Sequence, residues 1–142
     1  MKSDQKTPMV LEDIKVNVKL KLSALWASLM FIYVYVDILG FYEPGTIEDI
    51  LVGKVFEFDI TQTWALSGLI LMTIPSLMVF LALALPAKSN RWTNIIVAIL
   101  YIVVSIGNSI GETWTYFFFG STVESGLLIL IVWFAWKWPK QH

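Results

Sequence analysis

The sequence contains no cysteine, and its single histidine, His142, is the last residue. Thiol redox chemistry, disulfides and cysteine-ligated metal sites are therefore excluded, because each needs a thiol. A zinc or haem site held by histidines inside one chain is also excluded, because the only histidine is the last residue. No glycine-rich phosphate loop and no pairing of a nucleophile with a base is found. We therefore expect no catalytic residue, no metal and no cofactor.

Charge is also scarce and nearly balanced. Ten Lys and Arg face eleven Asp and Glu, which gives a formal net charge of −1. There is no basic stripe with interleaved aromatic residues, so no nucleic-acid partner is expected. Apolar residues are abundant instead, at 57% of the chain, where soluble domains have about 45–50%. A domain of 142 residues cannot bury so much apolar surface, so the expected partner is the lipid bilayer.

Four long apolar runs alternate with more polar segments, and each approaches or exceeds the ~20 residues that a spanning helix needs. They cover about residues 22–41, 63–85, 93–110 and 116–138. Transmembrane barrel strands would be half as long and would alternate polar and apolar residues. The polar N-terminal segment is not a signal peptide, so the first run is expected to remain. The sequence predicts one all-α membrane domain over residues 1–142, an up-down-up-down bundle of four transmembrane helices.

The ends of the predicted spans carry capping and anchoring residues. Thr61 or Thr63 is expected to cap the second helix, and Thr93 or Asn94 the third. Tryptophans near span ends are typical of interfacial anchors. Six are placed in this way: Trp26, Trp64, Trp92, Trp114, Trp136 and Trp138.

The basic residues lie almost entirely on one side of the predicted bundle. They are Lys2, Lys6, Lys15, Lys19 and Lys21 before the first span, Lys88 and Arg91 after the second, and Lys137 and Lys140 at the end of the chain. Only Lys54 lies in the opposite set of loops, which holds Glu43, Glu48, Asp49, Glu57, Asp59 and Glu112. Because positively charged loops stay in the cytoplasm, the sequence predicts a multi-pass protein of the cell membrane with both ends inside.

The first outer loop, residues 42–62, is too long for a tight turn. Thr46 and Asp49 resemble a capping box, which predicts a short helix that ends at Gly53. Two roles are open for this loop. It is either a cap that seals the bundle or a lid over an outward-facing cavity.

Several polar residues fall inside the predicted spans. With a helical rise of about 1.5 Å per residue, Asp37, Asn108 and Glu124 lie at comparable heights in the outer half, and Ser105 lies one turn below Asn108. Away from the span ends there is no basic partner, so both acids are expected to be neutral and to share a proton. These four residues are our candidate intramembrane polar site. The alternative is that Asp37 only reaches water and that Glu124 only bonds Asn108 or a neighbouring subunit.

Pro75 lies near the middle of the second span. Because proline has no N–H, it frees the carbonyl of Leu71 and is expected to kink the helix. Thr73 is expected to help satisfy the freed carbonyl. A hinge or an ion-coordinating carbonyl is the alternative role.

Several segments carry a family resemblance. They are AlaLeuTrp (24–26), TyrValAspIleLeuGly (35–40), IleThrGlnThrTrp (60–64), IlePro (74–75), AsnArgTrpThrAsnIleIle (90–96) and IleValTrpPheAlaTrpLysTrp (131–138). Together they resemble an uncharacterised family of small bacterial and archaeal four-helix membrane proteins, a domain of unknown function, over about residues 20–138. More distantly, the chain resembles the DoxX-like four-helix proteins. The resemblance implies the topology and intramembrane acids at Asp37 and Glu124, but no activity. In place of an acid expected in the second span of that family, this chain has Thr73.

Three classes of function are compatible with these features. The first is a structural or interaction protein that assembles with itself or another membrane protein, or that binds a lipid or quinone-like ligand without chemistry. The second is a proton-linked transporter or channel that acts as an oligomer, because four helices enclose little space. A membrane enzyme is third, since carboxyl groups alone can perform acid–base work but no motif indicates a substrate.

Overall fold

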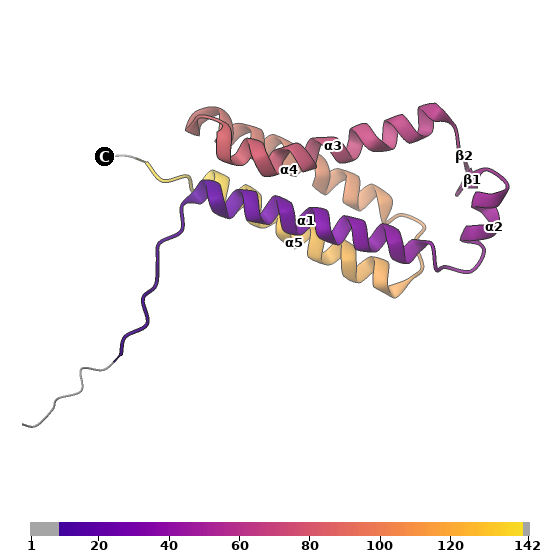
Figure 1. Cartoon of the computed structure of the whole chain (residues 1–142), viewed down its shortest axis with the longest axis horizontal. Coiled ribbons are helices and arrows are strands. Elements are labelled where there is room, and N and C mark those ends of the chain that lie inside the picture. The colour runs from indigo at the N-terminus through magenta and orange to yellow at the C-terminus, as the bar shows by residue number, and fades with distance from the viewer. Residues whose placement is uncertain (1–8, 141–142) are drawn as a thin grey trace, which may run out of the picture.

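The computed structural model describes residues 9–140 of the chain, so Lys2, Lys6 and His142 lie outside the described residues. Four long helices dominate it: α1 (Val18–Gly40), α3 (Gln62–Ala84), α4 (Ala87–Asn108) and α5 (Thr115–Trp136) (Figure 1). Each is long and apolar enough to cross a bilayer. The predicted all-α bundle of four spans is confirmed, and the chain is a multi-pass membrane protein.

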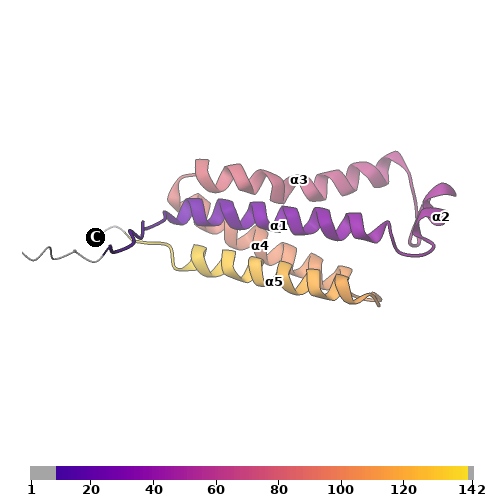
Figure 2. The same cartoon turned by 60° about the horizontal axis from the view of Figure 1, so that its bottom comes forward.

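The four helices run alternately up and down between two ends of the bundle. At the terminal end, α1 begins, α5 ends, and residues 85–86 join α3 to α4. The loop end carries residues 41–61 and 109–114. α1 packs against both α3 and α5, and α4 packs against α5, whereas α3 and α4 share much less contact (Figure 2). The bundle is therefore closed on three sides and weakly closed on the fourth.

The start of α3 agrees with the N-cap predicted from the sequence, whereas the start of α4 does not. The hydroxyl of Thr61 accepts a hydrogen bond from the backbone N–H of Trp64 at 3.1 Å, which caps α3 as predicted. α4 already begins at Ala87, directly after Pro86, so a cap at Thr93 or Asn94 is wrong. The polar residues after Pro86 are helical, and the connection between α3 and α4 is reduced to residues 85–86.

The loop between α1 and α3 holds a short helix and a small antiparallel hairpin: α2 (Thr46–Leu51), β1 (Lys54–Val55) and β2 (Phe58–Asp59). The predicted short helix is present, but Gly45 is its N-cap and no side chain bonds there, so the capping box of Thr46 and Asp49 is wrong. Gly53 follows the helix with φ +82°, a conformation that favours glycine. No residue from 41 to 62 is buried, so the loop adds nothing to the core of the bundle, and its roles as a cap or a lid stay predictions.

The terminal half of the bundle contains the core. Its fully buried apolar side chains come from all four long helices: Leu22, Leu29, Met78, Ala82, Ala98, Leu128, Ile131 and Ala135. A buried polar chain lies beside them. The Nε1 of Trp26 donates to Asn94 (2.7 Å), the side-chain amide of Asn94 donates to that of Asn90 (2.6 Å), and Asn90 donates to the carbonyl of Ala82 (2.7 Å). This chain joins α1, α4 and α3, and it shows that the interfacial role predicted for Trp26 is wrong.

The helices α1 and α5 approach closely at Gly120, which is buried. A Cβ atom added to Gly120 would lie 2.6 Å from Cγ2 of Val36, closer than side chains pack. Gly126, in the same helix, would have no atom within 4 Å of an added Cβ. The two glycines therefore make a matched pair.

We expect Gly120→Ala to destabilise the bundle by about 1–3 kcal/mol through overpacking. The midpoint of thermal unfolding in detergent should fall for this variant. Gly126→Ala is the control, and its midpoint should be unchanged or slightly higher because alanine favours a helix over glycine. Equal midpoints for the two variants would contradict the close approach of α1 and α5.

Candidate functional site

The helix α3 follows the bundle only over its second half. Its buried residues, Pro75, Met78 and Ala82, all lie there, whereas every residue from 62 to 70 is exposed. α3 changes direction near its middle, and its first half stands apart from α4 (Figure 1). A proline inside a helix is the usual cause of such a bend. In the loop-end half, α3 therefore does not pack against α4, and one side of the bundle is open.

The backbone carbonyl that Pro75 leaves without a partner is satisfied from another helix. The hydroxyl of Tyr101, on α4, donates to the carbonyl of Leu71. Thr73 does not take this role, because its hydroxyl donates to the carbonyl of Leu69 at 2.7 Å. The prediction for Thr73 is therefore wrong. Since lipid supplies no hydrogen-bond donor, the Tyr101 bond holds α3 to α4 just before α3 leaves the bundle.

We expect Tyr101→Phe to lower the free energy of unfolding by about 0.6–1.7 kcal/mol, the range of hydrogen bonds between membrane helices. In a Pro75→Ala background the same change should cost much less, because alanine restores the backbone N–H that bonds the carbonyl of Leu71 within the helix. Unfolding in detergent of the four proteins of this double-mutant cycle measures the difference. The same cost in both backgrounds would show that Tyr101 does not serve the freed carbonyl.

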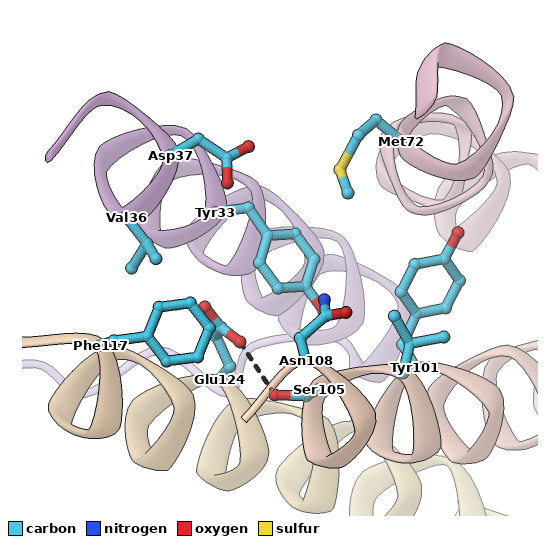
Figure 3. Close-up of a pocket in the computed structure, with 10 residues that line it drawn as sticks. Tyr33, Val36, Asp37, Met72, Tyr101, Ser105, Asn108, Phe117 and Glu124 are labelled. Atoms are coloured by element: carbon cyan, nitrogen blue, oxygen red, sulfur yellow. Dashed lines mark hydrogen bonds between the residues drawn. The ribbon is translucent and has the colours of Figure 1, made fainter. Parts of the chain in front are cut away.

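A pocket of about 50 Å³ lies where α3 departs from the bundle. It is lined by Tyr33, Val36 and Asp37 of α1, Met72 of α3, Tyr101, Val104, Ser105 and Asn108 of α4, and Phe117 and Glu124 of α5 (Figure 3). The four residues of the predicted polar site are all among them. The pocket has room for a few water molecules or one small polar group. The structure thus brings Asp37, Ser105, Asn108 and Glu124 together around one cavity.

Glu124 is the buried acid of this pocket, with 5% of its surface exposed. The hydroxyl of Ser105 donates to its Oε2 at 2.9 Å. The hydrogen-bond partner of Glu124 is therefore Ser105, and not Asn108 as in the alternative above. Asp37 and Asn108 are both exposed. Within residues 9–140 no hydrogen bond joins Asp37 to Glu124, so the shared proton stays a prediction. Glu124 keeps capacity for further hydrogen bonds, because a carboxyl group offers more than one.

Tyr33 belongs to this pocket, although it was not among the predicted site residues. Its ring projects from α1 into the middle of the pocket (Figure 3). Its hydroxyl is buried and has no hydrogen-bond partner in the described part of the chain. A buried polar group without a partner costs about 1–3 kcal/mol, which a bound hydroxyl, amine or water molecule would recover. The sequence feature that indicates Tyr33 as a site residue is its spacing, since it lies one helical turn before Asp37 on the same face.

These features define a class of protein: a four-span integral membrane bundle with a polar pocket in its loop-end half. Among residues 9–140 no group of three or more acidic, histidine or cysteine side chains could hold a metal ion. The chain belongs to a family of unknown function, DUF6326, whose model matches residues 9–142. This confirms the resemblance to an uncharacterised family. No curated protein and no solved structure matches the chain.

Proposed function

We propose that this protein binds a small amphipathic molecule, with the polar head in the pocket and the apolar tail in the bilayer. The observation that supports this function is that the buried Glu124 and Tyr33, whose hydroxyl has no partner in the described part of the chain, line the same cavity. Polar groups buried at membrane depth are costly and usually functional. A head group that bonds both would remove part of that cost.

The route into the pocket is supported by the exposure of its lining. Asp37 and Asn108 line the pocket and are exposed, so it has an open side. Residues 62–70 of α3 leave that part of the bundle uncovered. Apolar side chains also line the cavity, among them Val36 and Met72. A molecule can therefore reach the polar groups from the bilayer while its tail contacts apolar residues.

The chemistry of the lining favours a head group that donates hydrogen bonds. Two carboxyl groups, Asp37 and Glu124, face the cavity, and no basic residue of the described range 9–140 lines it. An alkylammonium group would favour the ionised form of the carboxyl group beside it and pair with that carboxylate, and a hydroxyl group would bond Tyr33 or Glu124. A carboxylate head would find no ion-pair partner in the pocket, and either acid in its ionised form would repel it. The ligand class is thus an amphipathic amine or alcohol.

Proton-linked transport by an oligomer is the second proposal, supported by the two carboxyl groups around one cavity. Within a single chain, however, the polar lining ends at Tyr101. The next buried polar side chain on α4 towards the terminal end is Asn94, ~10 Å away along the helix. Ala98 lies between them on α4 and belongs, with Leu29 and Met78, to the buried apolar core. This apolar core favours binding over conduction for one chain.

We also propose that the terminal end faces the cytoplasm and that the membrane is the cell membrane. Lys19, Lys21, Lys88 and Arg91 lie at the terminal end, and Lys54 lies at the loop end. This distribution agrees with the rule that positive loops stay inside. The pocket then opens in the outer half of the bilayer.

The proposal is tested with three probes of equal chain length: dodecylamine, dodecanol and dodecanoate. Native mass spectrometry of the purified protein in detergent should show retention in the order amine, alcohol, carboxylate. Glu124→Gln keeps the shape of the side chain but removes the carboxyl group that an ammonium head would hold in its ionised form. It should weaken retention of dodecylamine about tenfold to a hundredfold, since a hydrogen bond to a charged group contributes about 1.5–3 kcal/mol. Dodecanol retention should change by less than about twofold, because Gln keeps a donor and an acceptor.

Glu57→Gln is the matched control, because Glu57 is an exposed acid in the loop between β1 and β2, remote from the pocket lining. It should leave the retention of all three probes unchanged. If dodecylamine is retained equally by the wild type and Glu124→Gln, or if Glu57→Gln weakens it as much, the pocket is not the binding site.

A further inference from the structure

We propose a second site, at the terminal end, that binds the phosphate of an anionic lipid head group. It uses other residues than the first pocket, and it rests on the proposed cytoplasmic position of the terminal end. A pocket of about 460 Å³ lies between the start of α4 and the end of α5. It is lined by Ala87, Lys88, Arg91 and Trp92 of α4, by Trp136 of α5, and by Trp138, Pro139 and Lys140. Three basic side chains face it, and within residues 9–140 no acidic side chain lines it.

Arg91 is the central cation of this pocket. Its guanidinium carbon lies 5.3 Å from the ring centroid of Trp136 and 5.6 Å from that of Trp92. Stacking against aromatic rings of this kind holds a guanidinium group in place. The Nε of Arg91 is buried, yet it has no hydrogen-bond partner in the described part of the chain. A guanidinium group held in this way is suited to phosphate oxygens, which match its planar fork.

The start of α4 adds a second source of positive potential. Pro86 is the N-cap and makes no side-chain hydrogen bond, so no cap satisfies the first-turn N–H groups of α4. The N-terminus of a helix attracts anions through these groups and through its dipole. Ala87 and Lys88, the first two residues of the helix, line the pocket. The helix end and the basic side chains therefore point to the same occupant, an anion.

The surroundings of the pocket favour a lipid over a soluble phosphate. Trp92 and Trp136 are 48% and 61% exposed and lie at the ends of membrane spans. Tryptophans at this level occupy the boundary between head groups and acyl chains. Basic pockets between the cytoplasmic ends of membrane helices are suited to anionic head groups. A ligand with both a phosphate and acyl chains would use the cations and the aromatic rim together.

The experiment uses the full chain in detergent, titrated with phosphatidylglycerol and with phosphatidylcholine of the same acyl chains. Native mass spectrometry should show about fivefold or greater preference for the anionic lipid. Arg91→Gln and Lys140→Gln should each weaken phosphatidylglycerol binding about fivefold, the effect of one basic residue near a membrane surface. Lys140 is exposed and follows the last helix, so a loss in Lys140→Gln cannot come from misfolding.

Lys137→Gln is the matched control. Lys137 lies at the same end of α5, over the ring of Trp133 at 4.7 Å, but it does not line the pocket. Its substitution should leave phosphatidylglycerol binding unchanged. Equal weakening by Lys137→Gln and the two pocket variants, or equal affinity for the two lipids, would overturn the site. Displacement of the lipid by millimolar inorganic phosphate would assign the pocket to a soluble anion and overturn the lipid.

Discussion

The hydrogen bond from Tyr101 to the carbonyl of Leu71 fixes the geometry on which the pocket depends. In hydrocarbon no water can satisfy a carbonyl that proline has left without a donor. The bond therefore holds α3 to α4 at one level, one turn before Pro75. Towards the terminal end α3 packs in the core, and towards the loop end it leaves the bundle. The pocket lies where these two halves meet.

The two halves of the bundle differ in how far their buried polar groups are satisfied by hydrogen bonds. In the terminal half, Trp26, Asn94 and Asn90 form a continuous buried chain of hydrogen bonds that ends on α3. In the loop-end half, the hydroxyl of Tyr33 is buried without a partner in the described part of the chain, and the carboxyl group of Glu124 bonds Ser105. Satisfied networks rigidify a fold, whereas an unsatisfied group needs its own explanation. We therefore assign the first half to stability and the second to binding.

Much of this architecture could be predicted from the sequence, because the bilayer fixes the length of a span and the helix fixes its rise. These two constants are enough to place four spans, to put Asp37, Asn108 and Glu124 at similar heights and to put Ser105 one turn below Asn108. The early start of α4 was missed because the polar run from Lys88 to Arg91 resembles a loop, although the interface tolerates it in a helix.

Other features could not be predicted because they depend on partners that are remote in the sequence. The donor for Leu71 is 30 residues away, on another helix, so the nearer Thr73 was expected in its place. Trp26 lies near a span end, but its burial depends on Asn94 across the bundle. Tyr33 has no unusual sequence context, and only the packing of α1 against α5 places it beside Glu124.

The measurement that tests the account most directly is a crystal structure of the protein grown in a lipidic mesophase. We predict that residues 62–70 of α3 remain apart from α4 and that elongated density enters the pocket from the bilayer. The head of this density should lie within hydrogen-bond distance of Glu124 and Tyr33. A structure in which α3 closes against α4 along its whole length, with side chains filling the pocket, would contradict the account.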